Sequence, residues 1–131
     1  MSGTGGGAPV SAHEELRAMV QRYARAADSR DVPALEALFH PGAEIDGVRG
    51  PLPLAAWLDT MRAPRTAEYS MHMLGDPLIE LDAGAGRATV DTYGVVYAPD
   101  RTLGMRYIDD VELVEGRWLI RHRVSRAVWS R

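Results

Sequence analysis

The order of hydrophobic patterns along the chain is the feature that most constrains its fold. Apolar residues recur at helical spacing in three segments between residues 11 and 61, whereas from about Glu68 onward apolar and polar residues alternate as they do in strands. Helices that precede a run of antiparallel strands form an α+β domain. We therefore predict a curved antiparallel sheet that wraps around three N-terminal helices.

The first helical segment carries a continuous apolar stripe. Ser11 and Glu14 have the spacing of a capping box at its start. Asp28 extends the stripe at its end, so we expect this carboxylate to point toward the apolar side. Asp31 is placed to cap a second, short helix, and a third helix is predicted at residues 54–61. The stripe consists of Leu16, Met19, Val20, Tyr23, Ala24 and Ala27.

A short strand is predicted at residues 43–48, and five strands follow the third helix, at residues 69–74, 78–81, 87–97, 103–114 and 117–129. The last two strands are joined by Glu115-Gly116, a pair that suits a two-residue hairpin turn and fixes the register. On one side this register pairs Leu113 with Trp118, Val111 with Ile120, Asp109 with His122, Tyr107 with Val124, and Met105 with Arg126. On the other side it pairs Glu112 with Leu119, Asp110 with Arg121, and Ile108 with Arg123.

The composition excludes several classes of function. The net charge is −3 and the sequence pI is about 5.8, so we expect no nucleic-acid partner and no membrane surface as partner. Cysteine is absent, which excludes disulfides and thiolate chemistry and fits a cytoplasmic location. All 15 basic residues are arginine, which excludes lysine-based catalysis.

The length of 131 residues suits one domain. We expect residues 1–10, which are rich in glycine, to form a flexible tail and residues 11–131 to form a single domain. No apolar run approaches the ~20 residues that a membrane span requires. The histidines lack the spacing of a metal site, so neither a metal nor another cofactor is expected.

Four stretches of the chain carry a family resemblance. They are Tyr23-Ala-Arg-Ala-Ala-Asp28-Ser-Arg-Asp31, Ser70-Met-His72-Met, Arg106-Tyr107-Ile-Asp109 and Gly116-Arg-Trp118-Leu-Ile120. From Ser11 to Trp129 the chain resembles SnoaL-like proteins of the nuclear transport factor 2-like superfamily. The resemblance implies a cone-shaped α+β barrel with a deep, mostly apolar pocket.

Within that superfamily the chain is most similar to the scytalone dehydratase and bile-acid 7α-dehydratase group. Tyr23, Asp28 and His72 match a tyrosine and an aspartate on the group's first helix and a histidine on the strand after its third helix. Arg126 falls within about one position of an arginine used near the group's C-terminus. Two other positions depart from the group, because an acidic residue of the bile-acid enzyme falls on Val96 and a tyrosine of the scytalone enzyme falls on Ala27.

The resemblance implies a cofactor-independent dehydratase, isomerase or cyclase that acts on a hydrophobic, oxygenated cyclic molecule such as a polyketide or steroid-like compound. His72 would transfer the proton, Asp28 would hold one tautomer of its ring, and Tyr23 would donate a hydrogen bond to a developing enolate oxygen. An alternative function is a non-catalytic ligand-binding or accessory protein that uses the same pocket. Asp28 and His72 would then only position the first helix on the sheet.

Further side chains are expected around the ligand and between subunits. The substrate-binding candidates are Tyr107, Asp109, His122, Arg126, Met73 and Trp57. We predict that His72 lies within hydrogen-bond reach of Asp28, and that Asp109 and His122 point inward beside Tyr107. A structural role, fixing the hairpin, is the alternative for Asp109 and His122. We expect a homodimer or homotrimer that covers the outer sheet face, which carries Ile108, Leu119, Arg121 and Arg123.

Overall fold

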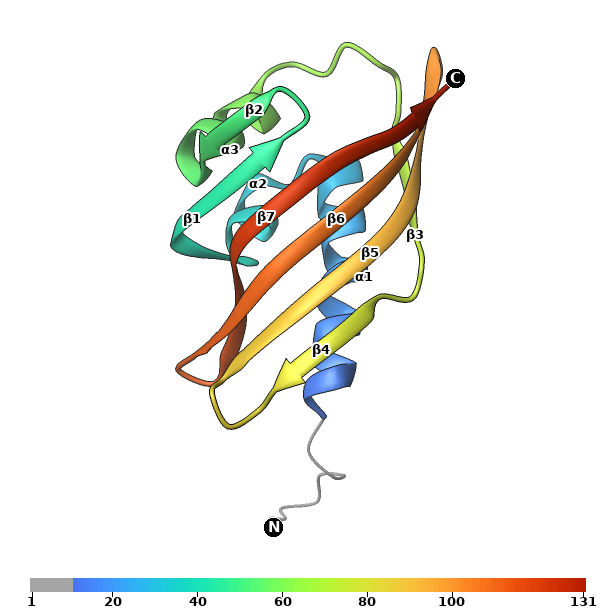
Figure 1. The fold of residues 1–131 in the computed structure, drawn as a ribbon. Coiled ribbons are helices and arrows are strands. Elements are labelled where there is room, and N and C mark those ends of the chain that lie inside the picture. The colour runs from blue at the N-terminus through green and yellow to red at the C-terminus, as the bar shows by residue number, and fades with distance from the viewer. Residues whose placement is uncertain (1–10) are drawn as a thin grey trace, which may run out of the picture.

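A computed structural model describes residues 11–131 (Figure 1). The helices are α1 (Ala12–Ser29), α2 (Val32–Glu36) and α3 (Leu54–Arg62). The strands are β1 (Phe39–Gly47), β2 (Gly50–Pro53), β3 (Met71–Leu74), β4 (Leu78–Asp82), β5 (Arg87–Ala98), β6 (Arg101–Val114) and β7 (Arg117–Ser130). The predicted tail, residues 1–10, lies outside the described residues.

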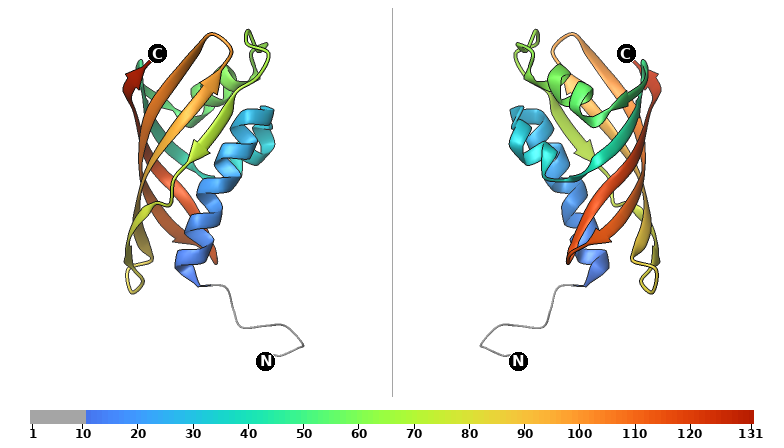
Figure 2. Two further views of the ribbon diagram at one scale, coloured as in Figure 1. Left: turned by 90° about the vertical axis from the view of Figure 1, so that its right-hand side faces the viewer. Right: turned by 90° about the vertical axis from the view of Figure 1, so that its left-hand side faces the viewer.

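The strands form one curved sheet that does not close on itself. Its order is β2-β1-β7-β6-β5-β3, and β4 pairs with β5 beside β3. Neighbouring strands are antiparallel, except that β1 runs parallel to β7. The helices lie on the concave side of this sheet (Figure 2). The α+β class and the bent sheet are therefore confirmed.

Helix α1 packs its apolar stripe into the concave face of the sheet, where Leu16 is fully buried. The helix begins at Ser11, whose side chain accepts a hydrogen bond from the backbone N–H of Glu14, as the capping pattern predicts. It ends at Arg30, which adopts the left-handed conformation with φ of 55°. Because the stripe continues to this end, the last turn of the helix brings Asp28 against the sheet.

Two elements in the first half of the chain differ from the sequence-based prediction. Strand β1 begins at Phe39 because this buried residue already pairs with Ile120 of β7. Strand β2 was not among the predicted strands; it folds back on the end of β1 after a turn that ends at Gly50, whose φ is 117°. The two prolines of β2 are tolerated because it is an edge strand.

The hairpin of β6 and β7 follows the predicted register only next to its turn. Residues 111–114 face residues 117–120 as predicted, but Arg121 is then an extra residue in β7. Such a β-bulge shifts the pairing by one residue and turns the later side chains of the bulged strand to the opposite face. Asp109 therefore faces Arg123 instead of His122.

The predicted pairs beyond the bulge are wrong for the same reason. The incorrect pairs are Asp109 with His122, Tyr107 with Val124, Met105 with Arg126, Asp110 with Arg121, and Ile108 with Arg123. The observed pairs are Asp109 with Arg123, Tyr107 with Ser125, Met105 with Ala127, Asp110 with His122, and Ile108 with Val124. Arg123 consequently lies on the inner face of the sheet, and not on the outer face where it was expected.

We predict that Gly94→Ala lowers the free energy of unfolding in urea by about 1–3 kcal/mol. A Cβ atom at Gly94 would collide with Leu74 Cδ2 and lie 3.0 Å from the carbonyl oxygen of Met73. The control is Gly84→Ala, where the new atom would meet only Asp82 Oδ1, at 3.7 Å. Equal stabilities of the two variants would contradict this account of the packing between β3 and β5.

Candidate functional site

Asp28 reaches from the end of α1 to strand β3 and contacts His72 there. The Asp28 Oδ1 atom lies 2.6 Å from His72 Nδ1, and Oδ2 accepts the backbone N–H of His72 at 2.9 Å. His72 faces the interior because it pairs with inward-facing Val96 of β5. The predicted hydrogen bond between Asp28 and His72 is thus confirmed. Their side chains are 24% and 11% exposed, so the pair is sheltered but remains accessible.

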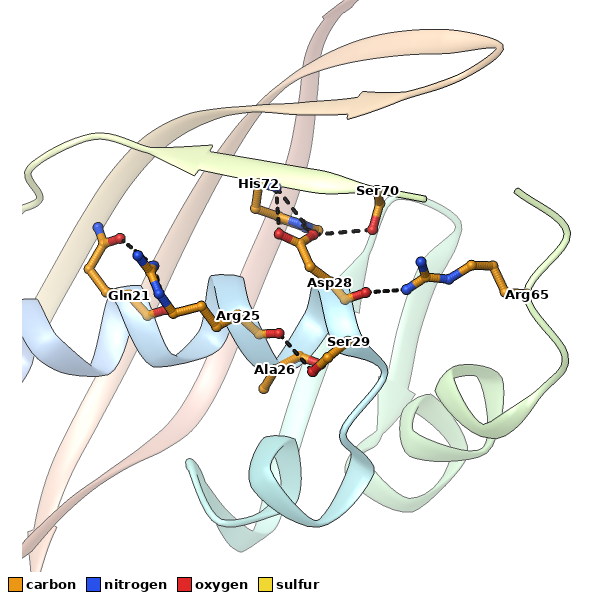
Figure 3. A network of polar contacts seen from close by, with 8 residues as sticks. All are labelled: Gln21, Arg25, Ala26, Asp28, Ser29, Arg65, Ser70 and His72. Atoms are coloured by element: carbon orange, nitrogen blue, oxygen red, sulfur yellow. Dashed lines mark hydrogen bonds and ion pairs between the residues drawn. The ribbon is translucent and has the colours of Figure 1, made fainter. Parts of the chain in front are cut away.

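The segment between α3 and β3 fixes Asp28 from a second side (Figure 3). Ser70 Oγ donates to Asp28 Oδ1 at 3.1 Å, and the guanidinium of Arg65 donates to the backbone carbonyl of Asp28. Arg30 donates to the carbonyl of Met61 at 3.3 Å, which also ties the end of α1 to the end of α3. The Asp28 carboxylate therefore has a defined orientation toward the imidazole.

Tyr23 lies between His72 and Tyr107. Its ring meets the His72 ring edge-on at 5.8 Å between centroids, and it meets the Tyr107 ring at 5.5 Å. Both tyrosines are buried, and burial raises the pKa of each phenol above its ordinary value. Both phenols therefore stay protonated at neutral pH and can act as hydrogen-bond donors.

Asp109 and Arg123 form a buried ion pair behind the two tyrosines. Arg123 Nε and Nη2 donate to the two carboxylate oxygens at 2.7 and 2.9 Å, and the side chains of Arg123 and Asp109 are 4% and 1% exposed. The guanidinium lies over the faces of Tyr23 and Tyr107, at 4.0 and 4.7 Å from their centroids. Burial acts to lower the pKa of Arg123, but the Asp109 carboxylate outweighs this effect and raises it.

Asp109 points inward beside Tyr107, as predicted, but His122 does not. The His122 side chain lies on the outer face, with Nε2 3.1 Å from Asp46 Oδ2 and Nδ1 3.8 Å from Asp110 Oδ2. The bulge at Arg121 is the reason for this orientation. The structure therefore gives no support to the expectation that His122 binds substrate in the interior.

Arg126 and Met73 also lie away from the candidate site. Arg126 is exposed and lies opposite Arg106 in the strand register, on the outer face of the sheet. The bulge reversed the orientation of the Arg126 side chain as well. Met73 is 58% exposed and pairs with outward-facing Val95. Their predicted contact with an interior ligand is corrected accordingly.

Trp57 of α3 is partly buried against the core, with its ring 5.5 Å from the Phe39 ring. It lies on the helix side of the interior. Its contribution to substrate binding stays a prediction.

A cleft of about 560 Å³ is lined by residues that neighbour Asp28 and His72, although neither member of the pair lines it. It is lined by residues that include Arg30, Arg65, Ser70 and Val96. Ser70 is hydrogen-bonded to Asp28, and Val96 faces His72 across the two strands. A ligand in this cleft would therefore lie next to the pair.

A larger cleft, of about 730 Å³, lies along α1, α2 and the turn between β6 and β7. None of Tyr23, Asp28 and His72 lines either cleft, so neither size nor direct lining identifies the site. The smaller cleft is the better candidate because its lining includes Ser70, which is hydrogen-bonded to Asp28 of an acid–base pair. Tyr23 and Tyr107 belong to the packed core, so side chains occupy the part of the interior where the resemblance implied a deep pocket.

Neither a metal-binding cluster nor a membrane-spanning helix is found within residues 11–131. No group of three or more His, Asp or Glu side chains in this part of the chain is arranged to hold a metal ion. Among the helices of the same residues, none has both the length and the apolar character needed to cross a membrane.

Sequence reasoning missed three polar residues of the site. Ser70 was part of the motif that carried the resemblance but received no role, and nothing in the pattern singled out Arg65. Arg123 was assigned to the outer face because an unbroken hairpin would place it there. Its neighbours Arg121 and His122 are polar as well, so the alternation of apolar and polar residues gives no clear signal of the bulge.

Comparison with known families identifies one match. The family model of the SnoaL-like domain matches residues 8–124. No curated protein matches the chain.

Solved structures share the fold at low sequence identity. A provisionally assigned scytalone dehydratase from Novosphingobium aromaticivorans has 21% identity and a TM-score of 0.80, over 89% of this chain and 84% of that one. The Kfla4162 protein from Kribbella flavida has 18% identity and a TM-score of 0.78, over 89% and 90%. A hexachlorocyclohexane dehydrochlorinase has 12% identity and a TM-score of 0.76, over 89% and 85%. At these identities the similarity establishes the fold alone.

We predict that Asp28→Ala lowers the free energy of unfolding by about 1–3 kcal/mol, because the buried backbone N–H of His72 and the Ser70 hydroxyl lose their acceptor. The control is Asp59→Ala, which removes an exposed ion pair with Arg62 and should cost less than about 0.5 kcal/mol. Urea unfolding followed by circular dichroism measures both values. Similar costs would show that Asp28 does not anchor β3 to α1.

Proposed function

The chain belongs to the SnoaL-like domain family, and from this membership and the geometry of His72 we propose that it is a cofactor-independent general acid–base enzyme. The reaction would be an elimination or isomerisation of a hydrophobic, oxygenated cyclic small molecule. Dehydratase, isomerase and cyclase activities all begin with removal of a proton from carbon. The single observation that carries the proposal is the 2.6 Å contact of Asp28 with His72 beside a cleft.

His72 would act as the base through Nε2. When Nδ1–H donates to the Asp28 carboxylate, Nε2 carries the lone pair and can accept a proton. Asp28 would also stabilise the imidazolium that forms, and its bonds to Ser70 and to the His72 backbone limit movement during the transfer. This is the arrangement that a carboxylate–imidazole base requires.

In a dehydration, His72 Nε2 would take the proton from the carbon next to a carbonyl group. The electrons of the broken C–H bond form the double bond as the C–O bond of the neighbouring hydroxyl breaks. The imidazolium then returns the proton to the departing hydroxide, which leaves as water, so one group completes the cycle. Tyr23, which burial keeps protonated and whose ring meets that of His72, would be the donor of a hydrogen bond to oxygen as the carbonyl gains charge.

Two solved structures with this fold support an elimination over other proton transfers. One is provisionally assigned as a scytalone dehydratase and the other is a hexachlorocyclohexane dehydrochlorinase. Water leaves in the first kind of reaction and hydrogen chloride in the second. The shared step is abstraction of a proton from a cyclic substrate, and the His72–Asp28 pair suits that step.

The protein is further proposed to form a homodimer or homotrimer through the outer face of the sheet. Arg123 does not belong to this face, and the exposed apolar residues lie mainly toward the β3 side and the far end of β7. They are Met71, Met73, Tyr93, Tyr97, Val128 and Trp129. Exposed apolar residues gathered in this way suit a contact with another subunit.

We predict that His72→Ala lowers kcat for a turned-over cyclic β-hydroxyketone by about 10²–10⁴-fold, because the base is lost. A panel of such ketones, with the conjugated product followed by its ultraviolet absorbance, measures the rate. His13→Ala, at an exposed position in the first turn of α1, should retain full activity. Tight ketone binding without turnover by the wild-type protein would instead support a ligand-binding protein.

We predict that light scattering at micromolar concentration gives the mass of a dimer or trimer, and that Met73→Glu shifts it toward the monomer. The new charge would have to be desolvated in the contact. Val48→Glu provides the control, since Val48 is similarly exposed but lies at the turn between β1 and β2. A monomeric wild-type protein would contradict the proposed assembly.

A further inference from the structure

Four buried or partly buried groups form a continuous series across the interior. The centroids of the His72 and Tyr23 rings are 5.8 Å apart, and the Arg123 guanidinium lies over the Tyr23 ring, 4.0 Å from its centroid. Arg123 in turn holds Asp109 by two hydrogen bonds. The series links a partly accessible imidazole to an ion pair that solvent does not reach.

The Asp109–Arg123 pair is a costly way to fill this part of the core. Removal of two charges from water is unfavourable, and apolar side chains of similar volume often stabilise a fold equally well. The pair is also incompletely satisfied, because Arg123 Nη1 is buried without a hydrogen-bond partner within residues 11–131. A role in stability alone therefore explains the pair poorly.

We propose that Asp109 and Arg123 are positioning residues of the His72 site and act on it through Tyr23. The Arg123 guanidinium packs on the face of the Tyr23 ring and fixes the position of that ring. Asp109 balances the charge of Arg123, so the imidazole of His72 meets little net electrostatic field from the core. This inference rests on the proposed function for its catalytic consequence. The electrostatic coupling itself can be tested without turnover.

The charged and titratable groups near His72 come from several elements. Asp28 and Tyr23 belong to α1, Arg65 contacts the Asp28 carbonyl from the segment before β3, and Tyr107 lies on β6. Behind these groups lies the Asp109–Arg123 ion pair, whose two opposite charges can be removed separately by substitution. A unit charge at about 10 Å in a partly buried setting shifts a protonation equilibrium by roughly one pH unit.

The experiment compares Asp109→Asn with Arg123→Gln in the full-length protein. Asp109→Asn leaves the guanidinium unopposed, which disfavours the imidazolium, so the acid limb of kcat/KM should move to lower pH by about half a unit or more. Arg123→Gln leaves the carboxylate and should move the limb to higher pH. The double variant should return toward the wild-type profile. The same displacements are expected in the pH dependence of the His72 ring-proton resonances in NMR spectra.

A matched ion pair on the outer face of the sheet serves as control. Arg106 binds Asp91 by two hydrogen bonds, at 2.9 and 2.6 Å, between strands β5 and β6. Asp91→Asn and Arg106→Gln should leave both the pH profile and the His72 resonances unchanged. Near-ultraviolet circular dichroism checks the fold of every variant. If Arg123→Gln does not fold, Asp109→Asn alone decides, because it should displace the profile to lower pH.

The outcomes separate this inference from the proposed function. Opposite displacements for the two single variants support the coupling. Displacements in the same direction, or none in folded variants, would overturn it and leave a structural ion pair. If no substrate is turned over, the proposed function fails, but the NMR titration still decides whether the pair acts on His72.

Discussion

The position of helix α1 on the concave face determines both the core and the candidate site. One stripe of this helix supplies buried Leu16, the ring of Tyr23 and the carboxylate of Asp28. The apolar part of the stripe provides the burial that holds the helix on the sheet. Asp28 is thereby brought to β3, and its contact with His72 follows from the packing of the helix.

The extra residue in β7 then decides which polar groups share that interior. Without the bulge at Arg121, His122 would lie opposite Asp109 and Arg123 would face outward. With it, the guanidinium of Arg123 lies between aromatic rings and the imidazole of His122 contacts carboxylates on the outer face. One backbone irregularity thus places a permanently charged guanidinium in the core in place of an imidazole.

Much of the fold could be predicted from the sequence because its signals are local and repeated. The capping box at Ser11, the stripe of α1 and the alternation of β5 to β7 each depend on near neighbours. The contact of Asp28 with His72 was also predictable, because the helix periodicity gave the direction of Asp28 and the family resemblance gave its partner. Arg123, Ser70 and Arg65 were not, since their roles depend on a bulge and on a loop whose path no periodic pattern specifies.

The site combines groups that have different requirements for solvent. His72 must exchange protons with a ligand and remains partly accessible, whereas Asp109 and Arg123 are almost completely buried. Tyr23 separates the two environments, because its ring contacts both the imidazole and the guanidinium. A fixed ion pair behind an aromatic ring keeps its orientation as a ligand enters and water leaves. Under the proposed coupling, the balanced charges therefore need little reorganisation during proton transfer, which is the property that makes preorganised groups effective in catalysis.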